Sequence, residues 1–167
     1  VFQGDVSVST ELLKLPFDHM FFTGAPNIGK VVMKAAAEHL SVCTLELGGK
    51  SPAIVENTAD IREAGKRIAW GKWVNAGQTC IAPDYVLVSE DKKIALIDAI
   101  HDTVKSFYGQ TPIEWRNSPD LCRIVNRRHF DRVKGLLDDA KKKGAQVAFG
   151  GDSDEHDNYI SPTVVTD

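Results

Sequence analysis

Two hydrophobic periods alternate along the chain. Short apolar runs of strand length occur at residues 19–23, 42–47, 53–55, 85–89 and 146–149, and a final run at 159–165 is interrupted by Pro162. Stretches with the three-to-four-residue apolar spacing of amphipathic helices lie between them, at 9–14, 27–40, 60–73, 92–107 and 126–143. The regular alternation of strands and helices favours an α/β fold of open, mostly parallel sheets with flanking helices.

Capping and turn residues set the expected limits of these elements. Asn27 is a good N-cap for the second helix, and Thr58 or Asp60 could cap the third. Gly144 ends the last helix. Residues 109–119 contain two prolines and are expected to form a loop, and residues 150–158 a polar turn.

Composition excludes several classes of function. The chain of 167 residues has 43% hydrophobic and 26% charged residues and a formal net charge of −3, so nothing favours nucleic acid or an anionic membrane as a partner. No apolar run approaches the roughly 20 residues of a membrane-spanning helix. The odd number of cysteines, Cys43, Cys80 and Cys122, lacks metal-ligand spacing and favours a reducing, cytoplasmic compartment.

Cys80 is the first candidate for chemistry. It ends the stretch Gly77-Gln78-Thr79-Cys80, which joins the predicted helix at 60–73 to the predicted strand at 85–89. A turn of this kind can present a thiol to a cleft, and its backbone N–H groups can stabilise a thiolate or an oxyanion. The residues alone leave a second interpretation open, in which Cys80 is a small buried side chain at a corner.

Glu46 is the second candidate. It lies between Leu45 and Leu47 at the end of a predicted strand and is followed by Gly48 and Gly49. A carboxylate in apolar surroundings has a raised pKa, which suits a general base near neutral pH. The alternative is a glutamate whose side chain reaches solvent at the strand end.

A third stretch is typical of a phosphate site. An apolar strand leads through Thr23 to Gly24, and a helix opens shortly before Gly29. Free N–H groups and the helix dipole favour an anion there. The glycine spacing matches neither the dinucleotide fingerprint nor a P-loop, in which Val31 would be serine or threonine.

Together these three stretches closely resemble the aldehyde dehydrogenase superfamily, in its order and spacing. Further segments, including residues 82–87 and 123–126, look most like its class 3, fatty-aldehyde-type branch. The resemblance implies that Cys80 is the catalytic nucleophile and Glu46 the general base. It also implies an NAD or NADP site. The residues of this chain that would form part of that site are Thr23, Gly24, Gly29, Leu47 and Gly48.

The resemblance further implies that residues 1–48 are the C-terminal part of a Rossmann-type NAD(P)-binding domain and residues 49–167 the N-terminal part of a catalytic domain. The implied reaction oxidises a medium-chain aliphatic or aromatic aldehyde to a carboxylic acid through a thiohemiacetal and a thioester on Cys80. The implied assembly is a homodimer. Two alternatives remain: a coenzyme A-acylating enzyme, and a chain that is an internal fragment, an inactive structural piece of a longer enzyme.

Overall fold

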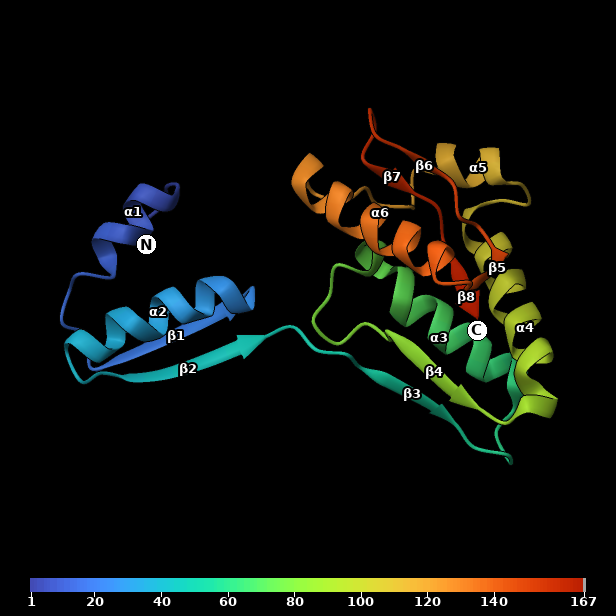
Figure 1. Ribbon diagram of the computed structural model, residues 1–167, viewed down its shortest axis with the longest axis horizontal. Helices are drawn as coiled ribbons and strands as arrows, with labels where there is room; N and C mark the ends of the chain where they lie inside the picture. The colour runs from blue at the N-terminus through green and yellow to red at the C-terminus, as the bar shows by residue number, and fades with distance from the viewer. Residues whose placement is uncertain (167) are drawn as a thin grey trace. The chain divides into compact units, whose positions relative to one another are not determined.

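The computed structural model describes residues 1–166, and Asp167, the last residue of the predicted second domain, lies outside them. The chain divides into two compact units, Val1–Gly49 and Lys50–Asp167, of which each is described by itself. Figure 1 shows the elements of both units, coloured from the N-terminus to the C-terminus. Helices and strands alternate in both, as the hydrophobic pattern predicts.

The first unit is a small β-α-β arrangement preceded by a short helix. It contains α1 (Val6–Leu12), β1 (His19–Gly24), α2 (Pro26–Glu38) and β2 (Val42–Leu47). The two strands pair in parallel, and α2 covers one face of the pair. Met20, Val32 and Ala36 are buried between helix and strands. This burial accounts for the apolar stripe of α2, although Val31 and Met33 of the same helix are exposed.

The start of α2 differs from the prediction. The N-cap is Ala25, which makes no side-chain capping bond, and Pro26 occupies the first helical position. The prediction of Asn27 as N-cap is therefore wrong. Proline is favoured at this position because its fixed φ suits a helix and its missing N–H would have no intrahelical partner there. The helix also ends at Glu38, before Leu40, which has a positive φ of 54°.

The second unit is built on a parallel strand pair covered by two long helices. It contains the following elements in chain order: β3 (Pro52–Val55), α3 (Ile61–Trp73), the 3₁₀ turn η1 (Val74–Gly77), β4 (Tyr85–Val88), α4 (Glu90–Tyr108), α5 (Pro112–Asn117), α6 (Arg127–Lys142), β5 (Gln146–Phe149), β6 (Ser153–Asp154), β7 (Tyr159–Ile160) and β8 (Val164–Thr166). β3 pairs with β4 in parallel, whereas β5–β8 and β6–β7 are antiparallel. Ala69, Leu96, Ile100 and Val104 form the centre of its core.

Three local predictions in this unit are corrected or settled. Asp60, of the two predicted candidates, caps α3 through its carboxylate. The segment predicted as a loop at 109–119 contains α5, which begins with Thr111 as N-cap and Pro112 as first residue. The predicted final strand, interrupted at Pro162, is confirmed as β7 and β8, because Pro162 cannot donate to a ladder, whereas the predicted polar turn also contains the short strand β6. The α/β class is confirmed, with two of the four described strand pairs parallel.

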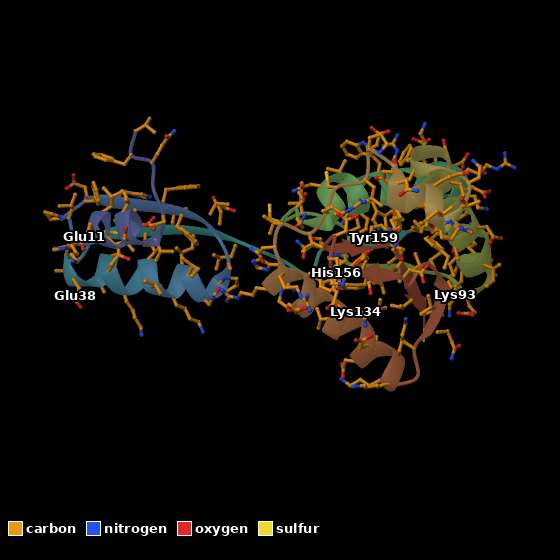
Figure 2. The ribbon with its side chains drawn as sticks, turned by 90° about the horizontal axis from the view of Figure 1, so that it is seen from above. Glu11, Glu38, Lys93, Lys134, His156 and Tyr159 are labelled. Carbon is orange, nitrogen blue, oxygen red and sulfur yellow. The ribbon has the colours of Figure 1, made fainter. Side chains whose placement is uncertain are left out.

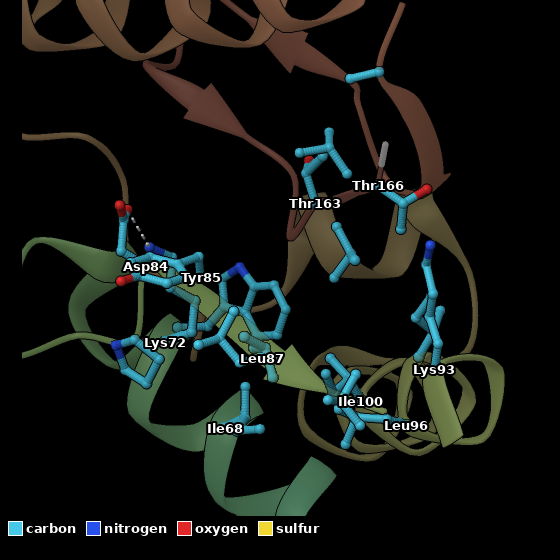
Figure 3. Close-up of a pocket in the computed structure, with 18 of the residues that line it drawn as sticks. Ile68, Lys72, Asp84, Tyr85, Leu87, Lys93, Leu96, Ile100, Thr163 and Thr166 are labelled. Atoms are coloured by element: carbon cyan, nitrogen blue, oxygen red, sulfur yellow. Dashed lines mark ion pairs between the residues drawn. The ribbon is translucent and has the colours of Figure 1, made fainter. Parts of the chain in front are cut away.

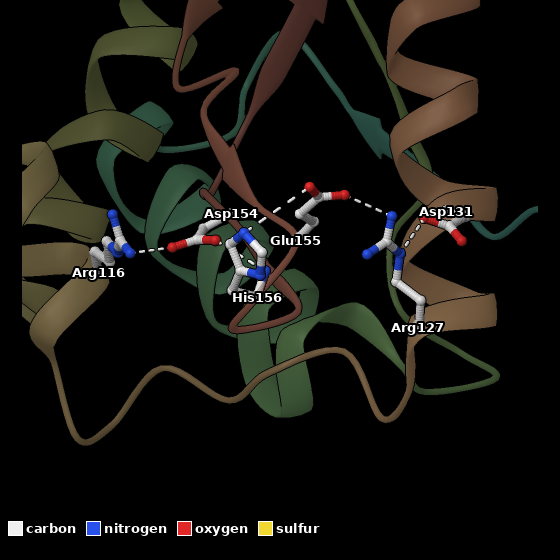
Figure 4. A network of polar contacts seen from close by, with 6 residues as sticks. All are labelled: Arg116, Arg127, Asp131, Asp154, Glu155 and His156. Carbon is white, nitrogen blue, oxygen red and sulfur yellow. Dashed lines mark hydrogen bonds and ion pairs between the residues drawn. The ribbon is translucent and has the colours of Figure 1, made fainter.

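Ion pairs fix the β6–β7 hairpin to the helices beside it. Figure 4 shows Asp154 paired with Arg116, and Glu155 with Arg127, which also contacts Asp131 at 2.6 Å. The pKa of Asp154 lies below its ordinary value, chiefly because the His156 backbone N–H donates to its carboxylate. Figure 2 shows the hairpin residues His156 and Tyr159 with their side chains. Ion pairs near solvent contribute little to stability, so their main effect is to fix the hairpin's orientation.

His101 makes the stability of this unit depend on pH. Its ring stacks on Phe149 with centroids 4.6 Å apart and meets Trp115 edge-on at 5.7 Å. Burial is the main cause that lowers its pKa below the ordinary value of 6.5. The unfolded chain therefore binds this proton more readily than the folded one, so stability falls as the pH drops below about 6.5.

We expect the melting temperature of the chain to decrease as the pH is lowered from about 7.5 to 5. We expect a smaller decrease in His101→Gln. His156→Gln is the matched control, since the His156 side chain is 90% exposed. Melting curves of the three proteins across this range give the result. Equal pH dependence in the chain and in His101→Gln would show that another group is responsible.

Candidate functional site

Cys80 lies on the connection between α3 and β4, in a tight turn. The Ala82 N–H donates to the Thr79 carbonyl at 3.1 Å, which closes the turn around the cysteine. Its side chain is exposed. The interpretation of Cys80 as buried filler at a corner is therefore ruled out within this unit, and the thiol is available for chemistry.

The backbone immediately before this turn is left-handed at three successive residues. Asn75 and Ala76 have φ of 53° and Gly77 has φ of 75°. This conformation costs about 1–2 kcal/mol for each residue with a side chain, because Cβ approaches the following carbonyl oxygen. Asn75 recovers part of this cost, since its amide donates to the Gln78 carbonyl at 3.2 Å. Strained backbone of this kind is concentrated at functional sites.

Lys72, to which the sequence pattern assigns no role, packs against this turn at Gly77. A Cβ added to Gly77 would lie 3.2 Å from the Lys72 carbonyl oxygen and 3.7 Å from its Nζ. Burial lowers the pKa of Lys72, and the carboxylate of Asp84, 3.9 Å away, acts in the opposite direction. The glycine at position 77 is therefore required both by its φ and by the close approach of Lys72.

The first unit gathers its predicted site residues at one edge. In the parallel register Thr23 lies opposite Glu46, and Gly24 lies opposite Leu47. Gly48 follows directly after β2. Both strands thus end at the same edge, which is where ligands bind in open α/β sheets. The Glu46 side chain is exposed on the face away from α2, so the predicted apolar enclosure is absent from this unit.

The start of α2, next to this edge, fits an anionic group. It has no side-chain cap and no acidic residue in its first turn, so the helix dipole favours negative charge there, although the N–H groups of Ile28 and Gly29 already donate to the Ala25 carbonyl. Gly29 is buried, and a Cβ there would lie 3.1 Å from Leu47 Cδ2. Gly29 therefore sets the close packing of α2 on β2, whereas a Cβ on Gly48 would meet nothing within 4 Å.

A cleft of about 660 Å³ opens between β4 and β8 in the second unit. Figure 3 shows Leu87, Leu96 and Ile100 on one side and Thr163 and Thr166 on the other. Cys80 does not line it. The hydrophobic pattern does not predict this cleft, because the cleft depends on how the C-terminal strands pair.

Two kinds of feature are absent from residues 1–166. No group of three or more His, Cys, Asp or Glu side chains could hold a metal ion there. No helix in the same range has the length and apolar character needed to cross a membrane.

Comparison with known proteins places these features in a family. The model of the aldehyde dehydrogenase family matches residues 2–167. Aldehyde dehydrogenase family 3 member A2 of Rattus norvegicus is 48% identical over 167 residues, which cover 100% of this chain and 33% of that protein. From the same species, "aldehyde dehydrogenase, dimeric NADP-preferring" is 47% identical, with 100% and 35% covered.

A solved structure gives the same result. The substrate-bound Staphylococcus aureus AldH superimposes with a TM-score of 0.86 and 49% identity, covering 97% of this chain and 34% of that one. The chain therefore spans about a third of the length of the relatives it matches.

Proposed function

The chain belongs to the aldehyde dehydrogenase family, and from this premise we propose that the protein containing it oxidises an aldehyde to a carboxylic acid with NAD or NADP. The motif-based resemblance to the family and to its class 3 branch is confirmed by the relatives. The observation that carries the proposal for this chain is the exposed thiol of Cys80 on its strained turn.

Cys80 is the proposed nucleophile. An aldehyde has no leaving group, so addition of the Cys80 thiolate to the carbonyl carbon first gives a tetrahedral thiohemiacetal. The Cys80 backbone N–H is a proposed donor to its oxyanion. Loss of hydride from that carbon leaves a thioester on Cys80, and the nicotinamide cofactor, when bound, accepts that hydride.

Glu46 is the proposed general base of the second step. Its carboxylate takes a proton from water, which attacks the thioester carbonyl; the carboxylic acid leaves and the Cys80 thiol is restored. A carboxylate at the carboxyl end of a parallel strand is in a suitable place for this role.

We propose that the residues around the start of α2 bind the cofactor phosphates. Thr23, Gly24 and Gly48 lie at the strand edge, and the uncapped helix start favours an anion. Leu47 and Gly29 support that edge by packing β2 against α2. On this proposal residues 1–48 belong to the NAD(P)-binding domain and residues 49–167 to the catalytic domain.

Substrate, assembly and compartment complete the proposal. The class 3 likeness supports a medium-chain aliphatic or aromatic aldehyde as substrate, and the name of the dimeric rat relative supports a homodimer. The cytoplasm is the proposed compartment because Cys43, Cys80 and Cys122 are all free thiols.

Hexanal and benzaldehyde with NAD or NADP test the proposal through the absorbance of the reduced cofactor. We expect turnover by the complete protein and none by the 167-residue chain, since the chain spans a third of its relatives. A silent complete protein would refute the proposed reaction. If the 167-residue chain oxidises aldehyde and Cys80→Ser abolishes that turnover, the chain alone assembles a working site.

The runner-up reaction is separated in the same assay. If coenzyme A accelerates turnover and an acyl-coenzyme A accumulates in place of the free acid, the enzyme is acylating. We expect release of the free acid, unaffected by coenzyme A, because Glu46 is the proposed base that activates water.

A further inference from the structure

Gln78 connects the turn of Cys80 to a segment far away in the chain. Its Nε2 donates to the Arg123 carbonyl at 3.0 Å, and its Oε1 accepts from the Val125 N–H at 2.9 Å. The side-chain amide therefore pairs with residues 123–125 as a backbone peptide group would pair with a neighbouring strand. Position 78 is separated from 125 by 47 residues, so local sequence gives no sign of the contact.

The orientation of this amide is determined by its partners. The Val125 N–H can only donate, so it requires the oxygen end of the amide. The Arg123 and Asn75 carbonyls can only accept, and Nε2 donates to both, each at 3.0 Å. A flipped amide would lose all three bonds.

The segment that receives Gln78 is itself firmly held. The Arg123 side chain binds the Asp157 carboxylate at 2.7 Å and the Leu121 and Arg116 carbonyls at 2.9 and 2.5 Å. Its guanidinium lies 5.0 Å from the centre of the Tyr159 ring. Gln78 thus joins the turn of Cys80 to an anchored segment.

On the other side, Gln78 holds the left-handed turn closed. Its backbone N–H and its Nε2 both donate to the Asn75 carbonyl, at 3.1 and 3.0 Å. The residues between them, Ala76 and Gly77, have positive φ. The side chain of Gln78, two positions before Cys80, therefore stabilises the strained turn and also fixes that turn to residues 123–125.

We propose that Gln78 is the positioning residue of Cys80. Its amide holds the cysteine turn in one place, so that the thiol meets the substrate carbonyl in a reactive geometry. This role rests on the proposed aldehyde oxidation. Small displacements of a reacting group reduce rates about 100-fold, so the loss of these bonds should lower kcat far more than it raises KM.

Hydrogen exchange in the 167-residue chain tests the contact without any reference to activity. Gln78→Met keeps the side-chain length but removes the three bonds, and Gln146→Met, at an exposed strand glutamine, is the control. We expect at least about 10-fold faster exchange in peptides covering 74–82 and 121–126 of Gln78→Met, with α4 unchanged. Unchanged exchange in both peptides would overturn the proposal.

Gln78→Glu adds a rescue by pH. The protonated acid can accept from the Val125 N–H and donate to one of the two carbonyls, whereas the carboxylate faces both carbonyl oxygens and cannot donate to either. Its folded pKa is then raised above the ordinary 4.3 of glutamate, so protection is present at low pH and lost as the pH rises through that pKa. Protection from hydrogen exchange is compared between Gln78→Glu and the unmodified chain at each pH. A ratio that does not change with pH would contradict the donor role.

Kinetics of the complete protein test the effect on Cys80. We expect Gln78→Met to lower kcat about 100-fold, with KM for aldehyde and cofactor within a few-fold and no burst of reduced cofactor, because addition of the thiolate becomes the slow step. A purely structural role would instead leave a burst of lower amplitude with an unchanged rate per active site, which would overturn the proposal. An inactive unmodified protein would refute the proposed function, while hydrogen exchange would still decide the contact.

Discussion

Replacing Cys80 with serine is expected to lower the turnover number for aldehyde oxidation at least about 10⁴-fold in the complete protein that contains this chain. The reason is chemical. A thiol ionises within reach of neutral pH and its thiolate adds readily to a carbonyl, whereas a serine hydroxyl does neither without a strong base. The side chain is exposed and lies outside the buried cores, so the substitution should leave the fold intact.

The control for this variant is Cys122→Ser, because Cys122 is also exposed and belongs to the same unit. We expect Cys122→Ser to retain activity within about two-fold, since surface substitutions rarely change stability by more than about 0.5 kcal/mol. Reduced-cofactor absorbance gives the rates and thermal melting gives the stabilities. If Cys80→Ser oxidises aldehyde at a substantial fraction of the normal rate, the nucleophile is another residue.

An acyl adduct locates the nucleophile directly. Quenching a reaction with hexanal and cofactor in acid preserves a thioester, and peptide mapping then identifies the modified residue. We expect the acyl group on the peptide that contains Cys80 and on neither of the other cysteines. Acylation of Cys43 or Cys122 would contradict the assignment even if Cys80→Ser is inactive.

The sequence predicts the parts of this fold that depend on local pattern. The apolar periods place α2, α3, α4 and α6 within a few residues, and Asp60 and Asn126 cap their helices through their own side chains. The prediction of a loop at the position of α5 is wrong, although the signals of a helix are present there. Thr111 and Glu114 have the spacing of a capping box, and Pro112 stands at the first helical position, but two prolines in the segment favoured a loop.

The cysteine turn shows what local pattern cannot predict. Alanine is the best helix former, and Ala76 follows a helix, yet it is left-handed here. The conformation is held by Gln78, whose partners at 123 and 125 are distant in the sequence. Tertiary contacts of this kind override propensity, and a single sequence gives no means of finding them.

The strand edge of the first unit can be predicted from the sequence only in part. The sequence places Thr23 and Glu46 each near the end of a strand, but only the parallel register sets them opposite one another. The apolar flanks of Glu46 predicted enclosure, and the side chain is exposed instead, because Leu45 and Leu47 point toward α2 while Glu46 points away. The exposure of Glu46 is therefore set by the alternation of side chains along the strand and not by the average hydrophobicity of the segment.

Glu46→Gln is expected to separate the two halves of the proposed reaction. The amide keeps the size of the carboxylate but cannot take a proton from water, so deacylation should slow about 10²–10⁴-fold. Addition of the thiolate and hydride transfer precede that step and should be little affected. Rapid mixing should therefore show a burst of reduced cofactor, close to one equivalent per active site, followed by a slow steady state.

The matched control is Glu38→Gln, an exposed glutamate at the end of α2 in the same unit, shown in Figure 2. We expect no change in burst or steady state for this variant. In Glu46→Gln the acyl group should also persist on Cys80 long enough to be found by peptide mapping. Disappearance of the burst would instead place Glu46 before hydride transfer, as the base that activates the thiol, because a residue acting only on water cannot affect an earlier step.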